Sequence, residues 1–448
     1  MILVRTRPVT SVRLLGIVLV FLCGVPVLNA DPPPADSTGP TRPNILFLLA
    51  DDLGWGDVSL HEGGVPSTPN IDCLASEGLE LRRYYAYPLC SPTRAALLTG
   101  QIPRRLGIVR ALGPQDPGLP ANLPTLPRIL QSAGYQTHLV GKWHLGSASP
   151  PLKSGFDHHY GFLAAEIDYF AHTNRLGRID WQRDGTTLDE AGYSTHLLAD
   201  EAVRILVERD PARPFYLQVA FNAPHFPLAA PEWNLAKYRS LQERAALFAG
   251  AVDAFDEAIG QILETVDRLG LRESTLVVFA SDNGPDRNGS CHPFRGGKST
   301  MYEGGLRVPC VLRWPGRLPG GTSSDDPVTA HDWFPTLTAA AGVDLPAGVP
   351  LDGMNVWPRL TRNSRDERGP FLMVSIDSAL YDGKWKLIEW ANGSRSLFDI
   401  VGDPGESRDR LATEVEIADR LMRQLKEMQR GIPAAGTVPP SGRPRRMR

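Results

Sequence analysis

The sequence is poor in cysteine, and after its first thirty residues it has no long apolar run. Its 448 residues contain five cysteines, too few for a fold held together mainly by disulfide bonds. No stretch beyond residue 30 reaches the ~18 consecutive apolar residues of a membrane-spanning helix, so we expect no membrane span. A chain of this length must then be stabilised by a large hydrophobic core.

The sequence also lacks a strong net charge. The formal net charge at pH 7 is -3, which argues against general attraction to nucleic acid. Arginines gather near the C-terminus, and we interpret residues 431–448 as a flexible basic tail. Any anion-binding site in the rest of the chain must therefore be local.

The first thirty residues have the pattern of a secretory signal peptide. Three arginines precede the apolar run 14–22, and small residues end the segment at Ala30. Residues 31–43 are rich in Pro, Ser and Thr and are predicted to be a linker. We therefore expect an exported protein, which is periplasmic, extracellular or lysosomal depending on the host.

From Asn44 onward, apolar runs typical of strands alternate with amphipathic segments typical of helices. This alternation predicts an α/β fold with a mainly parallel sheet between helices. After about Ala341, short strand-like pieces at 371–376 and 385–388 and a final helix near 414–429 predict a smaller α+β unit. We expect a catalytic domain at 44–345 and a C-terminal subdomain at 346–430.

Four of the predicted strands end in polar side chains. The predicted strands, each with the residues that come directly after it, are Ile45–Ala50 before Asp51-Asp52, Thr137–Val140 before Gly141-Lys142-Trp143-His144, Phe215–Phe221 before Asn222-Ala223-Pro224-His225, and Leu276–Ala280 before Ser281-Asp282-Asn283-Gly284. Ligands of open α/β sheets bind outside the carboxyl ends of the strands. One site could collect all four ends, although each alone is also explained by loop polarity or helix capping.

Asp51, Asp52, Asp282 and Asn283 offer only oxygen ligands, with three formal negative charges. Such a set suits Ca²⁺ or Mg²⁺ rather than zinc, which favours His and Cys. Calcium is preferred here because it tolerates irregular oxygen cages. The alternative is that these side chains cap helices or pair with arginines.

Cys90 precedes a segment that is competent to form a helix. Pro92 fits the first turn of that helix, where its missing N–H costs nothing. Cys90 would then lie just before a helix N-terminus, which favours a bound anion. These features make Cys90 a candidate nucleophile, and the alternative is a buried structural cysteine.

The segment Cys90-Ser91-Pro92-Thr93-Arg94, followed by Leu98-Thr99-Gly100, resembles the signature of the type I sulfatase family. Further matches follow in the family's order, at Asp51 to Asp57, Gly141 to Gly146, Ala223-Pro224-His225, Ser281 to Gly284 and Arg295-Gly296-Gly297-Lys298. The resemblance implies an alkaline-phosphatase-like fold and hydrolysis of a sulfate ester. It also implies that a maturation enzyme converts Cys90 to formylglycine, whose hydrated aldehyde attacks sulfur.

The resemblance assigns roles to the remaining motif residues. Asp51, Asp52, Asp282 and Asn283 would hold the cation together with the group formed at Cys90. Arg94 and Lys142 would hold the hydrate, and His144 would take its proton in the second step. His225 and Lys298 would face the ester oxygen. The chain has only seven lysines, and two of them fall in these motifs, which weakens the alternative of ordinary surface lysines.

Similarities at Gly155-Phe156-Asp157, Asp168-Tyr169-Phe170 and Tyr302-Glu303-Gly304-Gly305 resemble the arylsulfatase B branch of the family. They imply a sulfated saccharide substrate such as N-acetylgalactosamine 4-sulfate. Trp55, Tyr169, Tyr302 and Trp385 are candidate sugar-stacking platforms, although aromatic side chains more often lie in cores.

Several alternatives stay open at this stage. A phosphonate or phosphate monoester hydrolase could use the same fold, and a catalytically silent protein could bind sulfated glycans. The family often places Ser or Asn near position 166, where this chain has Glu166, so that contact is missing or the alignment shifts. Cys291 and Cys310 could form a disulfide, but sequence does not give the geometry.

Overall fold

The computed structural model describes residues 42–61, 66–113, 115–362 and 368–434. The predicted signal peptide lies outside the described residues, as do all but two residues of the predicted linker and most of the predicted tail. Residues from Arg42 onward belong to one compact unit, so the boundary at 345–346 stays a prediction. Within the described ranges, no helix combines the length and apolarity needed to cross a membrane.

A sheet of ten strands forms the centre of the fold, in the order β11-β2-β10-β9-β1-β8-β4-β5-β6-β7. The strands are β1 (Asn44–Ala50), β2 (Leu79–Leu81), β4 (Gln136–Lys142), β5 (His158–Phe162), β6 (Gln182–Arg183), β7 (Thr186–Thr187), β8 (Phe215–Ala220), β9 (Thr275–Ser281), β10 (Cys310–Arg313) and β11 (Thr322–Ser324). The block β9-β1-β8-β4-β5 is parallel. The antiparallel pairings involve β10, β6 and β7, so the predicted mainly parallel sheet is confirmed.

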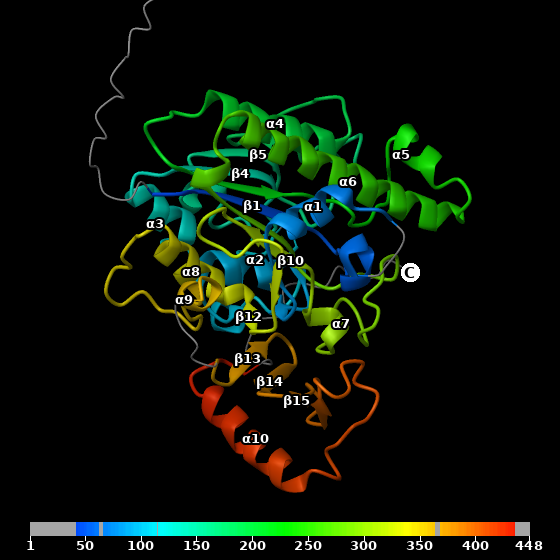
Figure 1. Cartoon of the computed structure of the whole chain (residues 1–448), viewed down its shortest axis with the longest axis vertical. Coiled ribbons are helices and arrows are strands. Elements are labelled where there is room, and N and C mark those ends of the chain that lie inside the picture. The colour runs from blue at the N-terminus through cyan, green and yellow to red at the C-terminus, as the bar shows by residue number, and fades with distance from the viewer. Residues whose placement is uncertain (1–41, 62–65, 114, 363–367, 435–448) are drawn as a thin grey trace, which may run out of the picture. The chain divides into compact units, whose positions relative to one another are not determined.

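Helices cover both faces of this sheet (Figure 1). The helices of this part of the chain are α1 (Pro69–Glu77), α2 (Cys90–Thr99), α3 (Leu126–Ser132), α4 (Ser194–Glu208), α5 (Glu232–Lys237), α6 (Glu243–Arg268), α7 (Glu303–Leu306), α8 (Trp333–Ala340) and α9 (Trp357–Leu360), and the faces are covered mainly by α1, α4 and α6 on one side and α2, α3 and α8 on the other. Successive residues of a strand point to opposite faces. Ile45, Phe47 and Leu49 of β1 therefore join the core formed with α2, α3 and α8. Leu46 and Leu48 join the other core, formed with α1, α4 and α6.

The C-terminal part contains an antiparallel sheet of four strands covered by a helix. The strands are β13 (Phe371–Val374), β14 (Ser378–Asp382), β15 (Trp385–Glu389) and β16 (Arg395–Asp399), and the helix is α10 (Val415–Met428). Leu421 and Leu425 of α10 pack against Leu372, Leu380 and Leu387 of the sheet. The other face of the sheet contributes to the core shared with α2 and α8. The predicted smaller α+β unit is therefore confirmed.

The strand register brings the four polar strand ends together. Ala50 of β1 pairs with Ser281 of β9, and Leu49 pairs with Ala220 of β8. Gly141 of β4 pairs with the same Ala220. The residues that follow these positions therefore emerge at one edge of the sheet, as the sequence predicted.

Candidate active site

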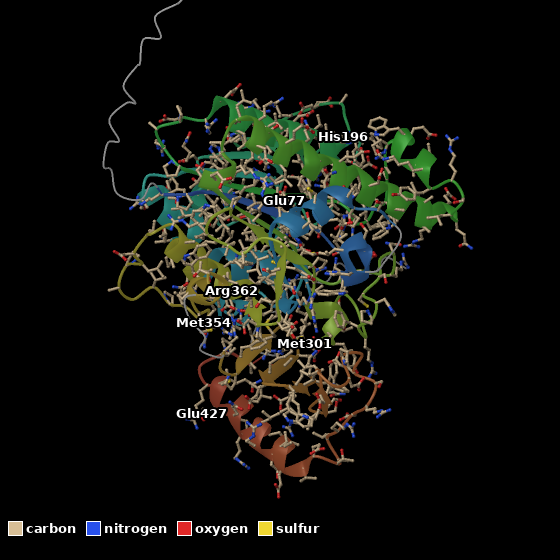
Figure 2. All side chains as sticks on the ribbon, viewed as in Figure 1. Glu77, His196, Met301, Met354, Arg362 and Glu427 are labelled. Atoms are coloured by element: carbon tan, nitrogen blue, oxygen red, sulfur yellow. The ribbon has the colours of Figure 1, made fainter. Side chains whose placement is uncertain are left out.

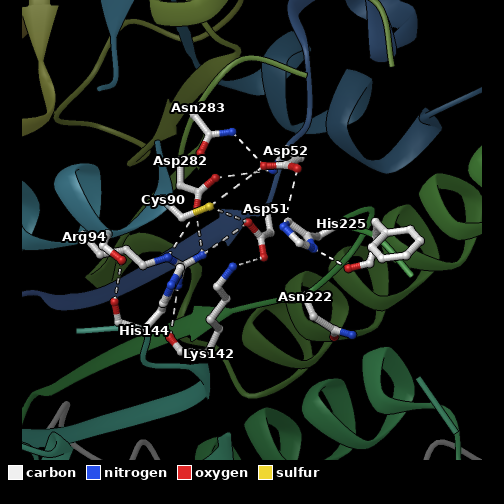
Figure 3. A network of polar contacts seen from close by, with 12 residues as sticks. Asp51, Asp52, Cys90, Arg94, Lys142, His144, Asn222, His225, Asp282 and Asn283 are labelled. Carbon is white, nitrogen blue, oxygen red and sulfur yellow. Dashed lines mark hydrogen bonds and ion pairs between the residues drawn. The ribbon is translucent and has the colours of Figure 1, made fainter. Parts of the chain in front are cut away.

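Cys90 was predicted to lie just before the helix, but it is the first residue of α2, and its side chain is buried. Its Sγ lies 3.5 Å from Oδ1 of Asp51 and 4.0 Å from Oδ1 of Asp52 (Figure 3). Burial raises the pKa of the Cys90 thiol well above its ordinary range, and Asp282 adds to this effect. Without a bound cation, the thiol is therefore held protonated at the start of the helix.

Three buried carboxylates surround this thiol, namely Asp51, Asp52 and Asp282. The backbone N–H of Asp52 donates to Oδ1 of Asp282 at 3.3 Å. Asp52 has a φ of 67°, a left-handed conformation that is uncommon for a residue with a side chain. Burial and the charge of Asp51 raise the pKa of Asp282. The carboxylates therefore repel one another unless positive charge lies among them.

Each carboxylate has a buried or partly buried cationic partner. Arg94 donates from Nε and Nη2 to Oδ2 of Asp282. Lys142 Nζ donates to Oδ2 of Asp51 at 2.5 Å. Lys298 Nζ lies 2.5 Å and 2.6 Å from the two carboxylate oxygens of Asp52.

The same contacts stabilise the charged forms of Lys298 and Asp51. Burial acts to lower the pKa of Lys298, but Cys90 and Asp52 outweigh it and raise that pKa above its ordinary value. Burial acts to raise the pKa of Asp51, but Lys142, His225 and Arg94 outweigh it and hold that pKa well below its usual range. The site thus contains balanced charges of both signs in an interior with little screening.

His144 is held as a neutral imidazole with one free nitrogen. Burial lowers its pKa well below the ordinary value, and Lys142 and Arg94 lower it further. Nε2 lies 3.0 Å from the carbonyl oxygen of Leu112, which can only accept, so Nε2 carries the hydrogen. Nδ1 is buried and has no partner among the described residues. A lone pair is therefore left on Nδ1, as a general base requires.

His225 lies beside Asp52, with Nε2 at 3.6 Å from Oδ2. Its Nδ1 contacts the carbonyl oxygen of Phe226. The hydroxyl of Tyr169 lies 3.0 Å from the carbonyl oxygens of both Asn222 and His225. Tyr169 is fully buried, so its predicted role as a sugar-stacking platform is wrong. Its side chain instead holds the loop that carries His225.

The residues present fit a hard cation. Ligand atoms of Asp51, Asp52, Cys90 and His225 all lie within 4.8 Å of one another. Asn283 Nδ2 donates to Oδ1 of Asp52 at 2.7 Å, whereas its Oδ1 is buried without a partner in the described part of the chain. An unpaired buried acceptor beside carboxylates is costly unless a cation or water satisfies it. His225, which the sequence assigned only to catalysis, joins the candidate ligand group.

Glu166 and Trp55 do not have the places in the site that the sequence analysis considered for them. Glu166 forms an ion pair with Arg175 at 2.5 Å, which neutralises its carboxylate. Trp55 is only 8% exposed and stacks on His61, so its predicted role as a sugar platform is wrong. Trp385 and Tyr302 are half-buried and stay candidates.

The structure also corrects the suggested disulfide. Cys291 and Cys310 are both free. Cys310 is buried in β10, whereas Cys291 contacts the carbonyl oxygens of Phe294 and Gly296. Their side chains are therefore used in packing and local contacts.

Comparison with known proteins identifies relatives along most of the chain. The sulfatase family model matches residues 43–343, and the model for the C-terminal part of N-sulphoglucosamine sulphohydrolase matches residues 296–431. Arylsulfatase J of Mus musculus is 31% identical over 89% of this chain and 77% of its own length. N-acetylgalactosamine-6-sulfatase of Homo sapiens is 36% identical over 75% of this chain and 69% of its own length.

Solved structures show the same fold. Ps i-CgsB, solved in complex with k-i-k-neocarrahexaose, has a TM-score of 0.81 and 31% identity, covering 87% of this chain and 93% of that chain. Phosphonate monoester hydrolase of Agrobacterium radiobacter has a TM-score of 0.64 and 21% identity, covering 87% and 95%, and shares the fold alone. On the family match and the curated relatives, this chain belongs to the sulfatase family and is a sulfuric ester hydrolase.

Proposed function

We propose that this protein hydrolyses the sulfate ester of a saccharide, with formylglycine formed from Cys90 and with a bound calcium ion. The observation that carries the proposal is the position of Cys90. Its Sγ lies at the first turn of α2 and 3.5 Å from Asp51. Arg94, Lys142 and Lys298 pair with the carboxylates around it. The position of Sγ marks the place that the oxygens of the hydrated aldehyde would occupy.

The proposed modification supplies a nucleophile that the buried thiol does not. A hydrated formylglycine offers one hydroxyl to attack sulfur and a second hydroxyl whose deprotonation releases sulfate. Position 90 suits this chemistry because the N-terminal turn of α2 favours an anion beside it. The maturation enzyme that makes this residue is part of the proposal.

Asp51, Asp52, Asp282 and Asn283 would hold the cation, which acts as a Lewis acid towards sulfate oxygens when bound. Support comes from the crowded carboxylates and the unpaired Asn283 Oδ1. The three carboxylates already have three cationic partners. A divalent cation would therefore leave the site with net positive charge, which suits an anionic sulfate ester.

The side chains around position 90 have different roles in the proposed reaction. Arg94 and Lys142 orient and neutralise charge at residue 90. His144 accepts a proton at Nδ1, because its Nε2 is committed to Leu112. Lys298 and His225 lie on the Asp52 side of the site, where they stabilise the departing ester oxygen.

A sulfated saccharide is the proposed substrate class. One relative acts on N-acetylgalactosamine 6-sulfate by its name, and one solved relative was crystallised with k-i-k-neocarrahexaose. The similarities to the arylsulfatase B branch favour the 4-sulfate of N-acetylgalactosamine. The proposal also includes export, on the pattern of residues 1–30.

Turnover of matched esters tests the reaction class. Protein produced with a maturation enzyme should release nitrophenol from 4-nitrophenyl sulfate faster than from 4-nitrophenyl phosphate or an aryl phosphonate. Sulfate release from N-acetylgalactosamine 4-sulfate and 6-sulfate then ranks the sugars. Preferential turnover of the phosphonate would show that the shared fold carries a different activity, and saccharide binding without any turnover would indicate a silent glycan binder.

A further inference from the structure

A groove lies between the loop that carries Lys298 and the turn that joins β15 to β16. It has a volume of about 530 Å³ and is lined by Tyr302, Asp377, Trp390, Ala391, Asn392 and Ser394. Its lining residues are all outside the polar cluster around Cys90. The groove takes no part in the proposed reaction.

Two aromatic rings form one part of the groove. The ring centroids of Tyr302 and Trp390 lie 5.3 Å apart at 56°, and both side chains are half-buried. Phe398 of β16 supports Tyr302 at 6.0 Å. The partly exposed ring of Trp390 offers an apolar face against which a sugar ring can stack, and Tyr302 packs beside it.

Polar groups line the rest of the groove. Oδ1 of Asp377 accepts from the backbone N–H of Ala391 at 2.6 Å, which fixes the carboxylate beside the turn. The Asn392 Oδ1 accepts from the backbone N–H of Ser394 at 2.9 Å. Its amide nitrogen has no partner among the described residues. Apolar faces with a few placed polar groups are typical of sites for small polar ligands.

A positive charge lies against Tyr302, one of the residues that line the groove. The guanidinium of Arg295 lies 4.1 Å from the centroid of the Tyr302 ring, and its Nη1 donates to the carbonyl oxygen of Glu406 at 3.0 Å. Within the described ranges, Arg295 has no carboxylate partner. An exposed arginine on an aromatic ring is suited to an anionic group of a ligand.

A single short loop connects Lys298 of the candidate active site with Tyr302 of the groove. The backbone N–H of Ser299 donates to the carbonyl oxygen of Pro88, two residues before Cys90, at 2.8 Å. Tyr302 follows three residues later, and Met301 between them is buried in the core shared with the C-terminal sheet (Figure 2). Lys298 and Tyr302 are therefore held by one anchored segment.

The close packing of Tyr302 on this loop depends on a glycine. Gly296 has a φ of 89°, and an added Cβ there would lie 2.9 Å from Cβ of Tyr302. Such a contact is too close for any side chain. Glycine at position 296 therefore allows the side chain of Tyr302 to pack closely against the loop.

We propose that this groove binds a neighbouring sugar of an anionic oligosaccharide whose sulfate ester occupies the site at Cys90. Trp390 would stack on that sugar with Tyr302 packed beside it, Asp377 and Asn392 would bond its hydroxyls, and Arg295 would pair with its sulfate or carboxylate. The inference rests on the proposed function, because it takes the reacting sulfate to lie at Cys90. It adds a recognition site made jointly by the catalytic body and the C-terminal sheet.

Kinetics with a small and a large substrate test this groove. The variants Trp390→Ala and Arg295→Gln are compared with the wild type on 4-nitrophenyl sulfate and on chondroitin 4-sulfate and 6-sulfate tetrasaccharides. We expect kcat/KM on the preferred tetrasaccharide to fall about tenfold more than on the aryl sulfate, as loss of one stacking or charged contact of ~1.4 kcal/mol predicts. Equal losses on both substrates, or no loss, would overturn the proposal.

Matched controls lie elsewhere on the surface. Trp233 of α5 is 59% exposed, and Arg317 lies over the ring of Trp314 at 5.9 Å. Trp233→Ala and Arg317→Gln should not alter the ratio of the two kcat/KM values. A change of the same size in these controls would mean that the effect is not specific to the groove.

A binding measurement separates the groove from the reaction. Calorimetry with the tetrasaccharides is performed on Cys90→Ala protein, with and without Trp390→Ala. About tenfold weaker binding of the double variant supports the groove even if no sulfate ester is turned over, which would defeat the proposed function alone. Unchanged affinity, or no binding to either protein, would overturn the groove while leaving aryl sulfate turnover to decide the function.

Discussion

Arg94 donates two hydrogen bonds to the same carboxylate oxygen of Asp282, from Nε at 3.0 Å and from Nη2 at 2.7 Å. This fork leaves Oδ1 of Asp282 facing the backbone N–H of Asp52. A lysine cannot reproduce it, because its ammonium is a single point charge. The geometry of the candidate cation site therefore depends on a guanidinium at position 94.

We expect Arg94→Lys to lower kcat on 4-nitrophenyl sulfate by roughly 10² to 10³, the usual effect of losing one charge-stabilising donor. The fraction of residue 90 that is converted is measured by peptide mass spectrometry, and kcat is expressed per converted enzyme. Arg82→Lys is the control, because the Arg82 side chain is half exposed and, in the described part of the chain, forms an ion pair with Glu80 alone. Near-normal activity of fully converted Arg94→Lys would contradict the assigned role.

Tyr169 should act through His225. Its hydroxyl contacts the two carbonyl groups that flank the turn before His225, so Tyr169→Phe should lower kcat about tenfold with little change in KM. The cost in stability should be about 1 kcal/mol, as for one hydrogen bond. Tyr193→Phe is a matched control, because that hydroxyl donates to Ala229. Equal effects of the two variants on kcat would refute a positioning role for Tyr169.

Removal of the cation should reduce both activity and stability. A ligand that binds only the folded state at one hundred times its Kd stabilises the protein by about 2.7 kcal/mol. Treatment with a chelator should therefore lower Tm and abolish turnover of 4-nitrophenyl sulfate. Calcium should restore both more fully than magnesium, and zinc should not restore activity, because the ligands are mainly oxygens. Full activity after exhaustive chelation would exclude a catalytic cation.

The ion pair of Lys386 joins the C-terminal sheet to the catalytic body. Lys386 Nζ lies 2.9 Å from Oε1 of Glu303 and 2.8 Å from Oε1 of Glu406, and all three side chains are fully buried. Lys386→Met leaves buried Glu406 without its cation and Glu303 with Arg307 at 3.8 Å, and should cost roughly 3–5 kcal/mol in the free energy of unfolding.

Urea unfolding measures this cost. Lys384→Met is the matched control, because the Lys384 side chain is 53% exposed in its pair with Asp399. That exposed pair should contribute less than ~1 kcal/mol. A loss for Lys386→Met no larger than for Lys384→Met would show that the buried network does not hold the two parts together.

The sequence predicted the sheet well because its central strands are apolar runs that end abruptly in polar residues. β1, β4, β8 and β9 begin and end within two residues of their predicted bounds. Since the carboxyl ends of parallel strands meet at one edge, the gathering of Asp51, Lys142 and Asp282 also followed from the pattern.

The remaining features depend on loop paths and long-range contacts. Tyr169 and Trp55 were expected to face a sugar, but both rings are buried, because nothing local distinguishes an exposed aromatic residue from a core one. The network of Glu303, Lys386 and Glu406 joins residues that are far apart in the sequence. The spacing of residues along the sequence does not predict such a contact. The free nitrogen of His144 likewise depends on Leu112, a residue with no polar side chain.

The state of residue 90 tests the central claim most directly. Protein produced with and without a maturation enzyme is analysed by peptide mass spectrometry, and turnover of 4-nitrophenyl sulfate is measured on the same samples in the presence of calcium. The account predicts that the Cys90 peptide loses roughly 18 Da on conversion of the thiol to the aldehyde, and that activity rises in proportion to the converted fraction. Undiminished activity of the unconverted protein, or of Cys90→Ala, would contradict it.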